Sequence, residues 1–254
     1  MISVIILTKN EEKNIVDCIE SVLWADEIIV LDDNSEDRTL EIIKNLPFSQ
    51  KIKIYKKSLD KDFASQRNYA LSKATKDWVL FLDADERIPA DLRKEINTLI
   101  NNEKSESKYD GFYILRKDII WGKMLKHGET GSIKLLRLAR RKAGVWYGKI
   151  HEEWKIDGRV SMLKNYLIHY PHQTIDEFLK EINFYTSIRA NELYQKGVKA
   201  SPLDIIIYPK AKFILNYFIK LGFLDGIEGF IFAILMSFHS FLVRGKLWLL
   251  WKRK

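Results

Sequence analysis

The first hundred residues alternate short apolar runs with helix-like segments, and this alternation limits the possible folds more than any other feature of the chain. The apolar runs are rich in Ile, Val, Leu and aromatic residues and cover Ile2–Leu7, Glu27–Asp32, Lys51–Tyr55 and Trp78–Asp83. Helical patterns follow them at about Glu11–Val22, Arg38–Asn45, Phe63–Ala74 and Pro89–Asn101. Strands that alternate with helices form parallel sheets covered by helices. The sequence therefore predicts an α/β fold with a mainly parallel sheet.

The remaining chain is more varied. Asn10 and Ser35 are expected to be helix N-caps, because acidic residues follow each of them. A polar loop is expected at Asn101–Lys108, further strands at Gly111–Arg116 and Ile133–Leu138, and no clear pattern at Gly144–Tyr170. Helices are expected at about Thr174–Lys196, Pro209–Leu221 and Ile227–Val243. We predict one catalytic-type domain over residues 1–200 and a helical segment over residues 201–254.

Composition narrows the class of protein. A charged fraction of 30% excludes a protein that lies mostly within a membrane. The single cysteine, Cys18, allows no intrachain disulfide, which fits a reducing compartment. The first apolar run has no basic region before it and is too short for a signal peptide. We therefore expect a cytoplasmic location.

Polar residues follow three of the predicted strands. They are Thr8, Lys9 and Asn10, then Asp32, Asp33 and Asn34, and then Asp83, Ala84 and Asp85. In open parallel sheets, ligands bind outside the carboxyl ends of the strands. These residues are thus expected to meet at one edge of the sheet, with acids at two of the three strand ends.

Asp83-Ala84-Asp85 is a D-x-D motif. Two carboxylates at a strand end can bind one hard cation, Mg²⁺ or Mn²⁺, which then bridges the oxygens of a diphosphate. An isolated D-x-D is more often an exposed acidic turn. Here the motif ends the apolar run Trp78–Leu82, and this position favours a metal site.

The segment Asp32–Ser35 has two interpretations. In the first, Ser35 caps a helix and the preceding residues form a turn. In the second, an Asp carboxylate accepts hydrogen bonds from a nucleotide base or ribose, and both interpretations can hold together. No glycine-rich loop follows the first strand, which argues against a dinucleotide-binding domain or a P-loop enzyme.

Four ordered motifs give a resemblance to a known family. They are Val4–Glu12, Leu31–Thr39, Gln66–Leu71 and Leu82–Glu86. Together they resemble the family 2 glycosyltransferases, whose nucleotide-diphospho-sugar transferase domain has the GT-A fold. The resemblance implies an inverting enzyme with one general base and a metal-stabilised diphosphate leaving group.

Downstream segments resemble one subgroup, the bacterial lipopolysaccharide-core β-1,4-glucosyltransferases. They are Lys149–Glu152, His169-Tyr170 and Lys220–Phe230. This resemblance implies UDP-glucose as the donor and an inner-core lipopolysaccharide acceptor. The stretch Glu129–Ala139 departs from the pattern, because it lacks a Pro-Asp pair and Ala139 replaces a Phe. A different specificity is compatible with that departure. Glu86 after the D-x-D argues mildly against a polyprenyl-phosphate sugar synthase, where Gln is common.

The resemblance also assigns roles to single residues. Glu152 is the candidate general base, with Glu153 as its rival and an ordinary pair of surface acids as the alternative. Asp83 and Asp85 are the candidate metal ligands. His151 and His169 are candidates for metal ligation or hydrogen bonding, although a lone His is more often structural. The candidate nucleotide-binding residues are Thr8, Asn10, Glu11, Asp32, Asp33, Arg67 and Asp83.

The C-terminal segment is basic and aromatic. From Leu203 onward, eight Lys and Arg stand against three Asp and Glu in a chain of net charge +8. Phe230–Val243 is apolar but only 14 residues long, whereas a spanning helix needs about 20. Trp248–Lys254 combines indole rings with cations, as at a lipid interface. We expect this segment to bind the anionic inner face of the cytoplasmic membrane without spanning it; the alternative is a soluble helical subdomain.

Two patterns refine the expected helices of this segment. Lys212, Asn216 and Lys220 form one polar stripe on an otherwise apolar helix. Small residues fall on one face of the next helix and favour a close helical hairpin; they are Gly226, Gly229, Ala233, Ser237 and Ser240.

Two other functions remain open at this point. The first is a family 2 transferase with another acceptor, such as a peptide, a capsular lipid intermediate or a teichoic-type polymer. The second is a degenerate transferase domain that binds anionic lipid or nucleic acid. The acids Asp32, Asp83, Asp85 and Glu152 argue against degeneracy, and we expect no nucleic-acid partner.

Overall fold

The computed structural model describes residues 1–60, 62–101, 108–131, 133–149 and 152–252. Most of the predicted loop Asn101–Lys108 lies outside these residues. The chain forms two compact units: residues 1–116 with 134–169, and residues 117–133 with 170–254. These units differ from the predicted domains 1–200 and 201–254, because the helix that begins at Ile175 packs with the later helices.

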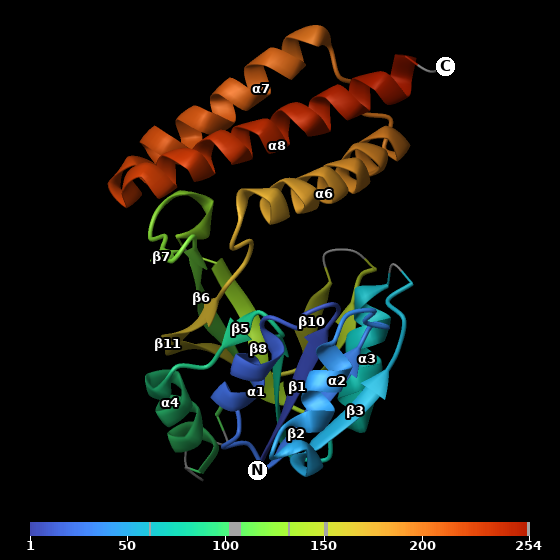
Figure 1. Ribbon diagram of the computed structural model, residues 1–254, viewed down its shortest axis with the longest axis vertical. Helices are drawn as coiled ribbons and strands as arrows, with labels where there is room; N and C mark the ends of the chain where they lie inside the picture. Colours follow the sequence, from blue (N-terminus) through green and yellow to red (C-terminus); the bar gives the residue numbers. More distant parts are fainter. Residues whose placement is uncertain (61, 102–107, 132, 150–151, 253–254) are drawn as a thin grey trace. The chain divides into compact units, whose positions relative to one another are not determined.

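The first unit contains the parallel sheet that the sequence predicts. Four strands lie side by side and parallel in the order β3-β2-β1-β4 (Figure 1): β1 (Ile2–Thr8), β2 (Glu27–Asp32), β3 (Ile52–Lys56) and β4 (Trp78–Asp83). The connecting helices are α1 (Ile15–Ser21), α2 (Thr39–Asn45) and α3 (Phe63–Lys73), with the 3₁₀ turn η1 (Ser49–Lys51) before β3. The predicted elements of this half are therefore confirmed.

Beyond β4 the sheet becomes partly antiparallel. It continues in the order β4-β8-β6-β11-β5, with β7 paired to β6. These strands are β5 (Glu86–Arg87), β6 (Gly111–Ile120), β7 (Lys123–Met124), β8 (Ile133–Arg140) and β11 (Val160–His169). Helix α4 (Ala90–Asn101) follows β5, and β9 (Gly144–Tyr147) with β10 (Glu153–Ile156) forms a separate hairpin. The described residues of the stretch Gly144–Tyr170, where the sequence shows no clear pattern, thus contain three strands.

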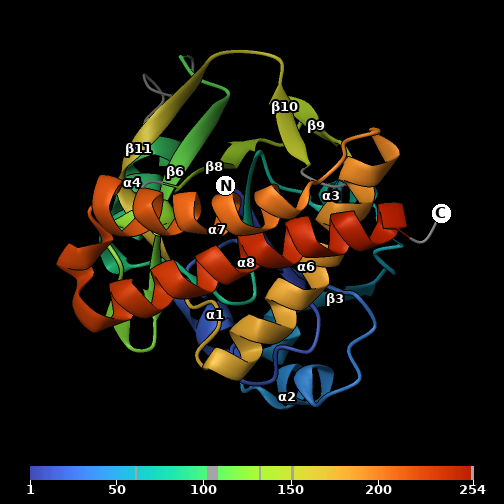
Figure 2. The ribbon, with the colours of Figure 1, turned by 90° about the horizontal axis from the view of Figure 1, so that it is seen from above.

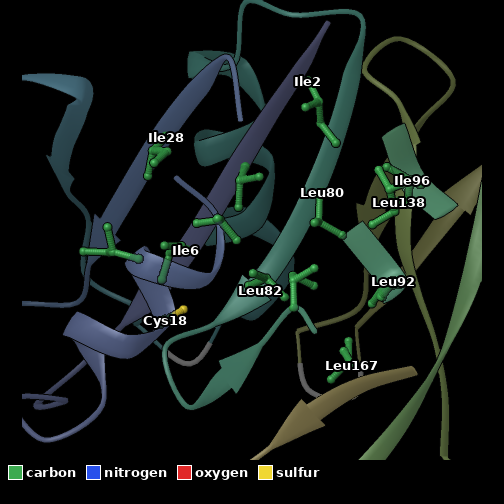
Figure 3. Packing of buried hydrophobic residues seen from close by; sticks show 14 of the residues in the cluster. Ile2, Ile6, Cys18, Ile28, Leu80, Leu82, Leu92, Ile96, Leu138 and Leu167 are labelled. Atoms are coloured by element: carbon green, nitrogen blue, oxygen red, sulfur yellow. The ribbon is translucent and has the colours of Figure 1, made fainter. Parts of the chain in front are cut away.

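The core lies on both faces of the parallel strands, which explains why these strands read as continuous apolar runs. Alternate residues of β1 point to opposite faces: Ile2 and Ile6 belong to one buried cluster and Ile5 to another. Figure 3 shows the first cluster, in which Cys18 of α1 packs near Ile6 and Leu82. The packed core fixes the register of β1 and β4 and therefore the position of their polar ends.

The predicted N-caps at Asn10 and Ser35 are wrong. Helix α1 begins one turn later, after Asn14, and α2 begins after Arg38. Asn10 and Ser35 instead tie two loops together: the Ser35 hydroxyl accepts from the Asn10 amide at 2.9 Å, and Asn10 Oδ1 accepts from the Glu36 amide at 2.7 Å. A short polar side chain before a helix can hydrogen-bond the amides of a loop as well as those of a helix N-terminus. The sequence alone therefore does not distinguish a loop residue of this kind from an N-cap.

The second unit is mainly helical. It contains the 3₁₀ turn η2 (Gly128–Thr130), α6 (Ile175–Gln195), α7 (Pro202–Ile214), the π-helical turn η3 (Leu215–Ile219), the turn η4 (Gly222–Asp225) and α8 (Gly226–Lys252). Within this unit α7 and α8 lie side by side (Figure 2). The predicted hairpin is therefore confirmed, and small residues permit it: a Cβ on Gly229 would lie 2.0 Å from the Gly222 carbonyl oxygen. The Ser237 hydroxyl donates to the Pro209 carbonyl at 2.8 Å.

The predicted start of the first hairpin helix is wrong. The helix begins at Pro202 rather than at Pro209, because Ser201 and Asp204 form a capping box and Pro202 occupies the first turn. Pro209 lies inside α7, and a π-helical turn follows at Leu215. Ser201 and Asp204 supply capping side chains around Pro202, whereas no Ser, Thr, Asp or Asn directly precedes Pro209.

Helix α8 is longer than predicted. It runs for 27 residues, and the segment Gly222–Lys252 is long and apolar enough to cross a membrane by length and composition, with a mean hydropathy of 1.7. The argument that this region is too short to span a bilayer is therefore wrong. A buried helix of a soluble protein meets the same criterion, and 28% of the apolar window is buried. Binding at the membrane surface stays a prediction.

Of the three residues in the hairpin's polar stripe, only Lys220 is exposed. Lys212 pairs with Glu129, and the Asn216 side chain is buried and donates to the Lys212 carbonyl at 3.2 Å. The Lys220 carbonyl accepts from the Gly128 amide at 3.0 Å. The stripe therefore attaches the hairpin to the turn at Gly128–Thr130, within the same unit.

Candidate functional site

The polar ends of three strands meet as predicted. Strand β1 lies between β2 and β4, so that Thr8 pairs with Asp32 and Leu7 pairs with Asp83. The chain continues the pairing one residue further: the Asp33 amide donates to the Thr8 carbonyl at 2.9 Å. The carboxyl ends of β1, β2 and β4 therefore bring these acids to one edge.

The two acids at the carboxyl end of β2, Asp32 and Asp33, hold loops in place. Asp32 is buried and accepts from the Ser35 amide and hydroxyl at 3.0 and 2.5 Å. Asp33 accepts from the Leu59 amide at 2.7 Å and from Lys9 Nζ at 2.9 Å. Both carboxylates thus shape the edge of the sheet, which agrees with the turn interpretation of this segment.

Thr8 is the last residue of β1, and Glu11 lies in the loop that follows it. Thr8 Oγ1 is buried and has no hydrogen-bond partner in the part of the chain that the structure describes. The Glu11 amide donates to Thr39 Oγ1 at 2.8 Å, and the Glu11 carboxylate accepts from Asn14 at 2.8 Å. The Thr8 hydroxyl is therefore a polar group at this edge that a ligand can satisfy.

Asp83, the first acid of the D-x-D, lies between two arginines. Arg67 Nη2 donates to its Oδ1 at 3.2 Å, and Arg137 Nη2 donates to its Oδ2 at 2.5 Å. Burial opposes the charge on this carboxylate, but Arg137 and Arg67 outweigh that effect and hold the pKa of Asp83 well below its usual range. Asp83 is therefore an anion in the folded protein.

Glu86 lies beneath the surface and contacts both Asp83 and Arg137. Its side chain is fully buried, accepts from the Asp83 amide at 3.0 Å, and accepts from Arg137 Nη2 at 3.0 Å. Burial raises the pKa of Glu86, and Arg137 opposes that rise. Glu86 thus fixes both the backbone of the D-x-D and the position of the Arg137 guanidinium.

Arg67 joins the D-x-D to the candidate base. Its Nε donates to Glu152 Oε1 at 2.9 Å, while its Nη2 contacts Asp83, so one guanidinium contacts acids 69 positions apart in the chain, Asp83 and Glu152. The guanidinium carbon lies 4.7 Å from the ring centre of Trp146. Helix α3 presents this buried arginine because its other buried residues, such as Ala64 and Ala70, pack on the sheet.

A cavity of about 360 Å³ adjoins these groups. It is lined in part by Arg67, Arg137, Trp146, Glu152, Glu153 and Trp154. Trp146 and Trp154 stack across the β9–β10 hairpin with ring centres 5.3 Å apart. Cations, two acids and aromatic faces around a space of this size fit a polar small molecule.

Glu152 and Glu153 differ in their surroundings. Both line the cavity, but only Glu152 contacts Arg67. The Glu152 side chain is 15% exposed, whereas Glu153 is exposed at the start of β10. His151 lies outside the described residues. The arrangement favours Glu152 over Glu153 as the acid coupled to the D-x-D.

Asp85, the second acid of the D-x-D, pairs with a histidine. Its Oδ2 lies 3.1 Å from His169 Nε2, at the end of β11. Among the described residues no three His, Cys, Asp or Glu side chains form a ready metal cluster. Mg²⁺ and Mn²⁺ sites often have one or two carboxylates, with diphosphate oxygens and water as the other ligands. Asp83 and Asp85 supply two hard oxygen donors of this kind. Both oxygens of Asp83 also accept from Arg67 and Arg137, so a metal ion would share that carboxylate with the two arginines.

Cys18 lies beneath this edge. Its Sγ is 3.7 Å from the Asp83 carbonyl oxygen, and burial raises the pKa of the thiol. The side chain is completely buried in the core cluster of Figure 3. Cys18 is therefore a packing residue directly behind the D-x-D.

Sequence reasoning missed Arg137 and the structural role of Glu86. Arg137 is buried in β8, a strand that joins the sheet antiparallel to β4, so the parallel strand-end rule does not reach it. A signal was present: a charged residue between Leu136 and Leu138 in a predicted strand needs a buried partner.

Comparison with known proteins agrees with this architecture. The model for "Glycosyl transferase family 2" matches residues 3–153. An uncharacterized glycosyltransferase of Rickettsia typhi is 28% identical over 97% of this chain and 86% of its own length. The lipopolysaccharide core biosynthesis glycosyltransferase LpsC of Rhizobium meliloti is 26% identical over 97% of this chain and 92% of its own.

Solved structures are more distant. The crystal structure of S. aureus TarS residues 1–349 in complex with UDP-GlcNAc has 16% sequence identity and a TM-score of 0.49, covering 99% of this chain and 91% of that chain. The family match covers more than half of the sequence. The chain belongs to glycosyl transferase family 2 and is a glycosyltransferase. The predicted GT-A fold class, a mainly parallel sheet with flanking helices and a long apolar C-terminal helix, is confirmed.

Proposed function

We propose that this glycosyltransferase is an inverting, metal-dependent hexosyltransferase that uses a nucleotide-diphospho-sugar. One observation carries the proposal: Arg67 contacts both Asp83 of the D-x-D and Glu152. An inverting transfer needs an anion-binding group for the diphosphate and a base for the acceptor hydroxyl on opposite sides of one sugar. The cavity beside Arg67 and Glu152 provides a space for that sugar.

Each residue has a distinct role in this proposal. Glu152 accepts the proton of the acceptor hydroxyl as the hydroxyl oxygen attacks the anomeric carbon and the bond to the diphosphate breaks. Arg67 and Arg137 supply positive charge next to the departing diphosphate, and Glu86 keeps Arg137 in position. Asp83 and Asp85 would hold Mg²⁺ or Mn²⁺, which would offset the charge that develops on the diphosphate. Thr8, Asn10, Glu11, Asp32 and Asp33 form the nucleotide-binding edge.

We propose UDP-glucose as the donor and a lipid-borne glycan, such as the lipopolysaccharide inner core, as the acceptor. The name of the relative LpsC, which spans nearly the whole chain, supports this choice of acceptor. The apolar helix α8 and its basic end support a location at the inner face of the cytoplasmic membrane, close to a lipid-borne acceptor.

Two measurements test the proposal. A panel of nucleotide sugars is scored for donor turnover with and without Mn²⁺, and UDP binding is titrated into the wild type and the Asp83→Ala variant. We expect one UDP-hexose to turn over only with metal and Asp83→Ala to lose metal-dependent UDP binding while keeping its circular dichroism spectrum. Turnover that is independent of metal, or equal UDP affinity in both proteins, would contradict the metal assignment.

Flotation of the full chain with vesicles tests the location. Removing α8 is a poor test, because Phe232 and Leu235 of α8 pack against Phe178 and Ile182 of α6. We therefore expect the intact protein to float with anionic vesicles, to float less with neutral vesicles, and to be partly released by high salt. Release by detergent alone would indicate insertion of the helix instead of surface binding.

A further inference from the structure

The helical unit contains a cavity of its own. It has a volume of about 340 Å³ and lies among α6, α7 and α8, which Figure 2 shows together. This volume falls within the roughly 300–1,000 Å³ of small-molecule sites. All of its lining residues belong to this second unit, so the geometry of the cavity does not depend on the first unit.

The cavity is basic. Arg189, Lys212 and Arg244 line it together with His239, whose pKa is lowered by burial, and no carboxylate lines it among the described residues. Lys212 and Arg189 each have an acidic partner, Glu129 and Glu192. Arg244 has no carboxylate within 4.0 Å among the described residues; its guanidinium carbon lies 3.7 Å from the centre of the Tyr208 ring. Within the described part of the chain, Arg244 thus forms no ion pair that an anion would have to displace, although Asp204 of the same helical unit adds negative charge nearby.

The rest of the lining is apolar. Leu193, Leu215 and Val243 form walls of the cavity beside the basic groups. Helix α7 has no buried residue, and Ile207 and Ile214, next to cavity residues Tyr208 and Leu215, are each 49% exposed. Phe241 of α8 is also exposed. Cations at an apolar, exposed surface match an anionic amphiphile better than a free anion.

We propose that this cavity binds the phosphate headgroup of an anionic membrane phospholipid. The phosphate lies near Arg244 and Arg189, and the acyl chains extend along the exposed apolar residues of α7 and α8. A charge-assisted contact between a guanidinium and a phosphate is strong and geometrically specific. The site is separate from the D-x-D region and needs neither donor nor acceptor.

The test uses the full chain and soluble short-chain lipids. Dihexanoyl phosphatidic acid is titrated into the protein, with dihexanoyl phosphatidylcholine and inorganic phosphate as comparison ligands. We expect saturable binding of the phosphatidic acid and binding of inorganic phosphate that is at least about tenfold weaker, because phosphate lacks the apolar part. Equal affinity for inorganic phosphate would overturn the lipid assignment and indicate a free-anion site.

A matched pair of variants distinguishes specific binding in the cavity from non-specific attraction to the positive surface. Arg244→Gln removes one cation from the cavity, and Lys210→Gln removes one from the exposed surface of α7 outside it. We expect Arg244→Gln to weaken phosphatidic acid binding about tenfold or more and Lys210→Gln to leave it nearly unchanged. Equal losses would show that only overall charge matters and would overturn the proposal.

A third variant reduces the volume of the cavity without changing its charge. Ala211 lines the cavity, and its exposed side chain on α7 makes Ala211→Phe compatible with folding. This substitution fills the cavity while keeping Arg189 and Arg244. We expect it to abolish saturable phosphatidic acid binding with an unchanged circular dichroism spectrum and unchanged donor turnover. Retained binding would show that the lipid does not enter the cavity.

Discussion

Replacement of Glu27 by Gln should lower the free energy of unfolding of the first unit by about 3 kcal/mol at neutral pH. Glu27 begins β2, and its buried carboxylate accepts from Ser3 Oγ at 2.5 Å, Lys53 Nζ at 2.7 Å and the Thr75 amide at 2.8 Å. Burial alone would raise its pKa, but these hydrogen bonds lower the pKa to about 2 from its ordinary value of 4.5. Glu27 therefore connects β1 and β3 with the segment before β4.

The magnitude and the pH range follow from this shift. A decrease of roughly 2.5 pKa units corresponds to about 3 kcal/mol of folding free energy. Because the folded pKa is lower than the unfolded one, this contribution is complete above about pH 4.5 and is lost as pH falls towards 2. About 2 kcal/mol of it should be lost between pH 7 and pH 3.

The assay is urea unfolding of the wild type, Glu27→Gln and the control Glu20→Gln from pH 7 down to pH 3. Glu20 is an exposed acid on α1, so its replacement removes the same charge without the buried hydrogen bonds. We expect the gap between wild type and Glu27→Gln to narrow as pH falls, with the control following the wild type. A gap that is small at pH 7, or constant with pH, would refute this account of Glu27.

Three further variants test other parts of the structure. Glu152→Gln should reduce turnover by roughly 10²- to 10⁴-fold while UDP affinity is retained, as kinetics and titration will show; activity within a few-fold of wild type would move the base to Glu153. Glu86→Gln should weaken the contact that positions Arg137, so we expect a higher KM for the donor and a nearly unchanged melting temperature. A large fall in melting temperature with a normal KM would show that Glu86 is purely structural. Gly229→Ala should lower stability by roughly 1–3 kcal/mol, because its Cβ would overlap the Gly222 carbonyl, and an unchanged thermal melt would contradict this packing.

The parallel half of the fold could be predicted because its physical signals are local and consistent. β1, β2 and β4 are apolar on both faces, which is typical of parallel strands covered by helices, and the carboxyl ends of parallel strands share one edge. The placement of Asp33 and Asp83 around the end of β1 follows directly from that rule.

The antiparallel half and the helix starts could not be predicted in the same way. Arg137 contacts Asp83 only because β8 pairs with β4 across a long separation in sequence, and no local pattern specifies that pairing. Asn10 and Ser35 satisfy loop amides instead of helix amides, although both uses need the same short polar side chain. In each case the deciding partner is distant in the chain, so it is known only after the chain has folded.

The position of Cys18 allows local opening around the D-x-D to be measured through modification of its thiol. It is the single thiol of the chain, it is completely buried, and its sulfur lies behind the backbone of Asp83. A thiol reagent can react only after this region opens, so the rate of modification under native conditions measures the free energy of that opening. A nucleotide sugar bound at the D-x-D should slow the reaction in proportion to the opening that it suppresses. Occupancy of the site can thus be followed by mass spectrometry without an acceptor or a labelled donor.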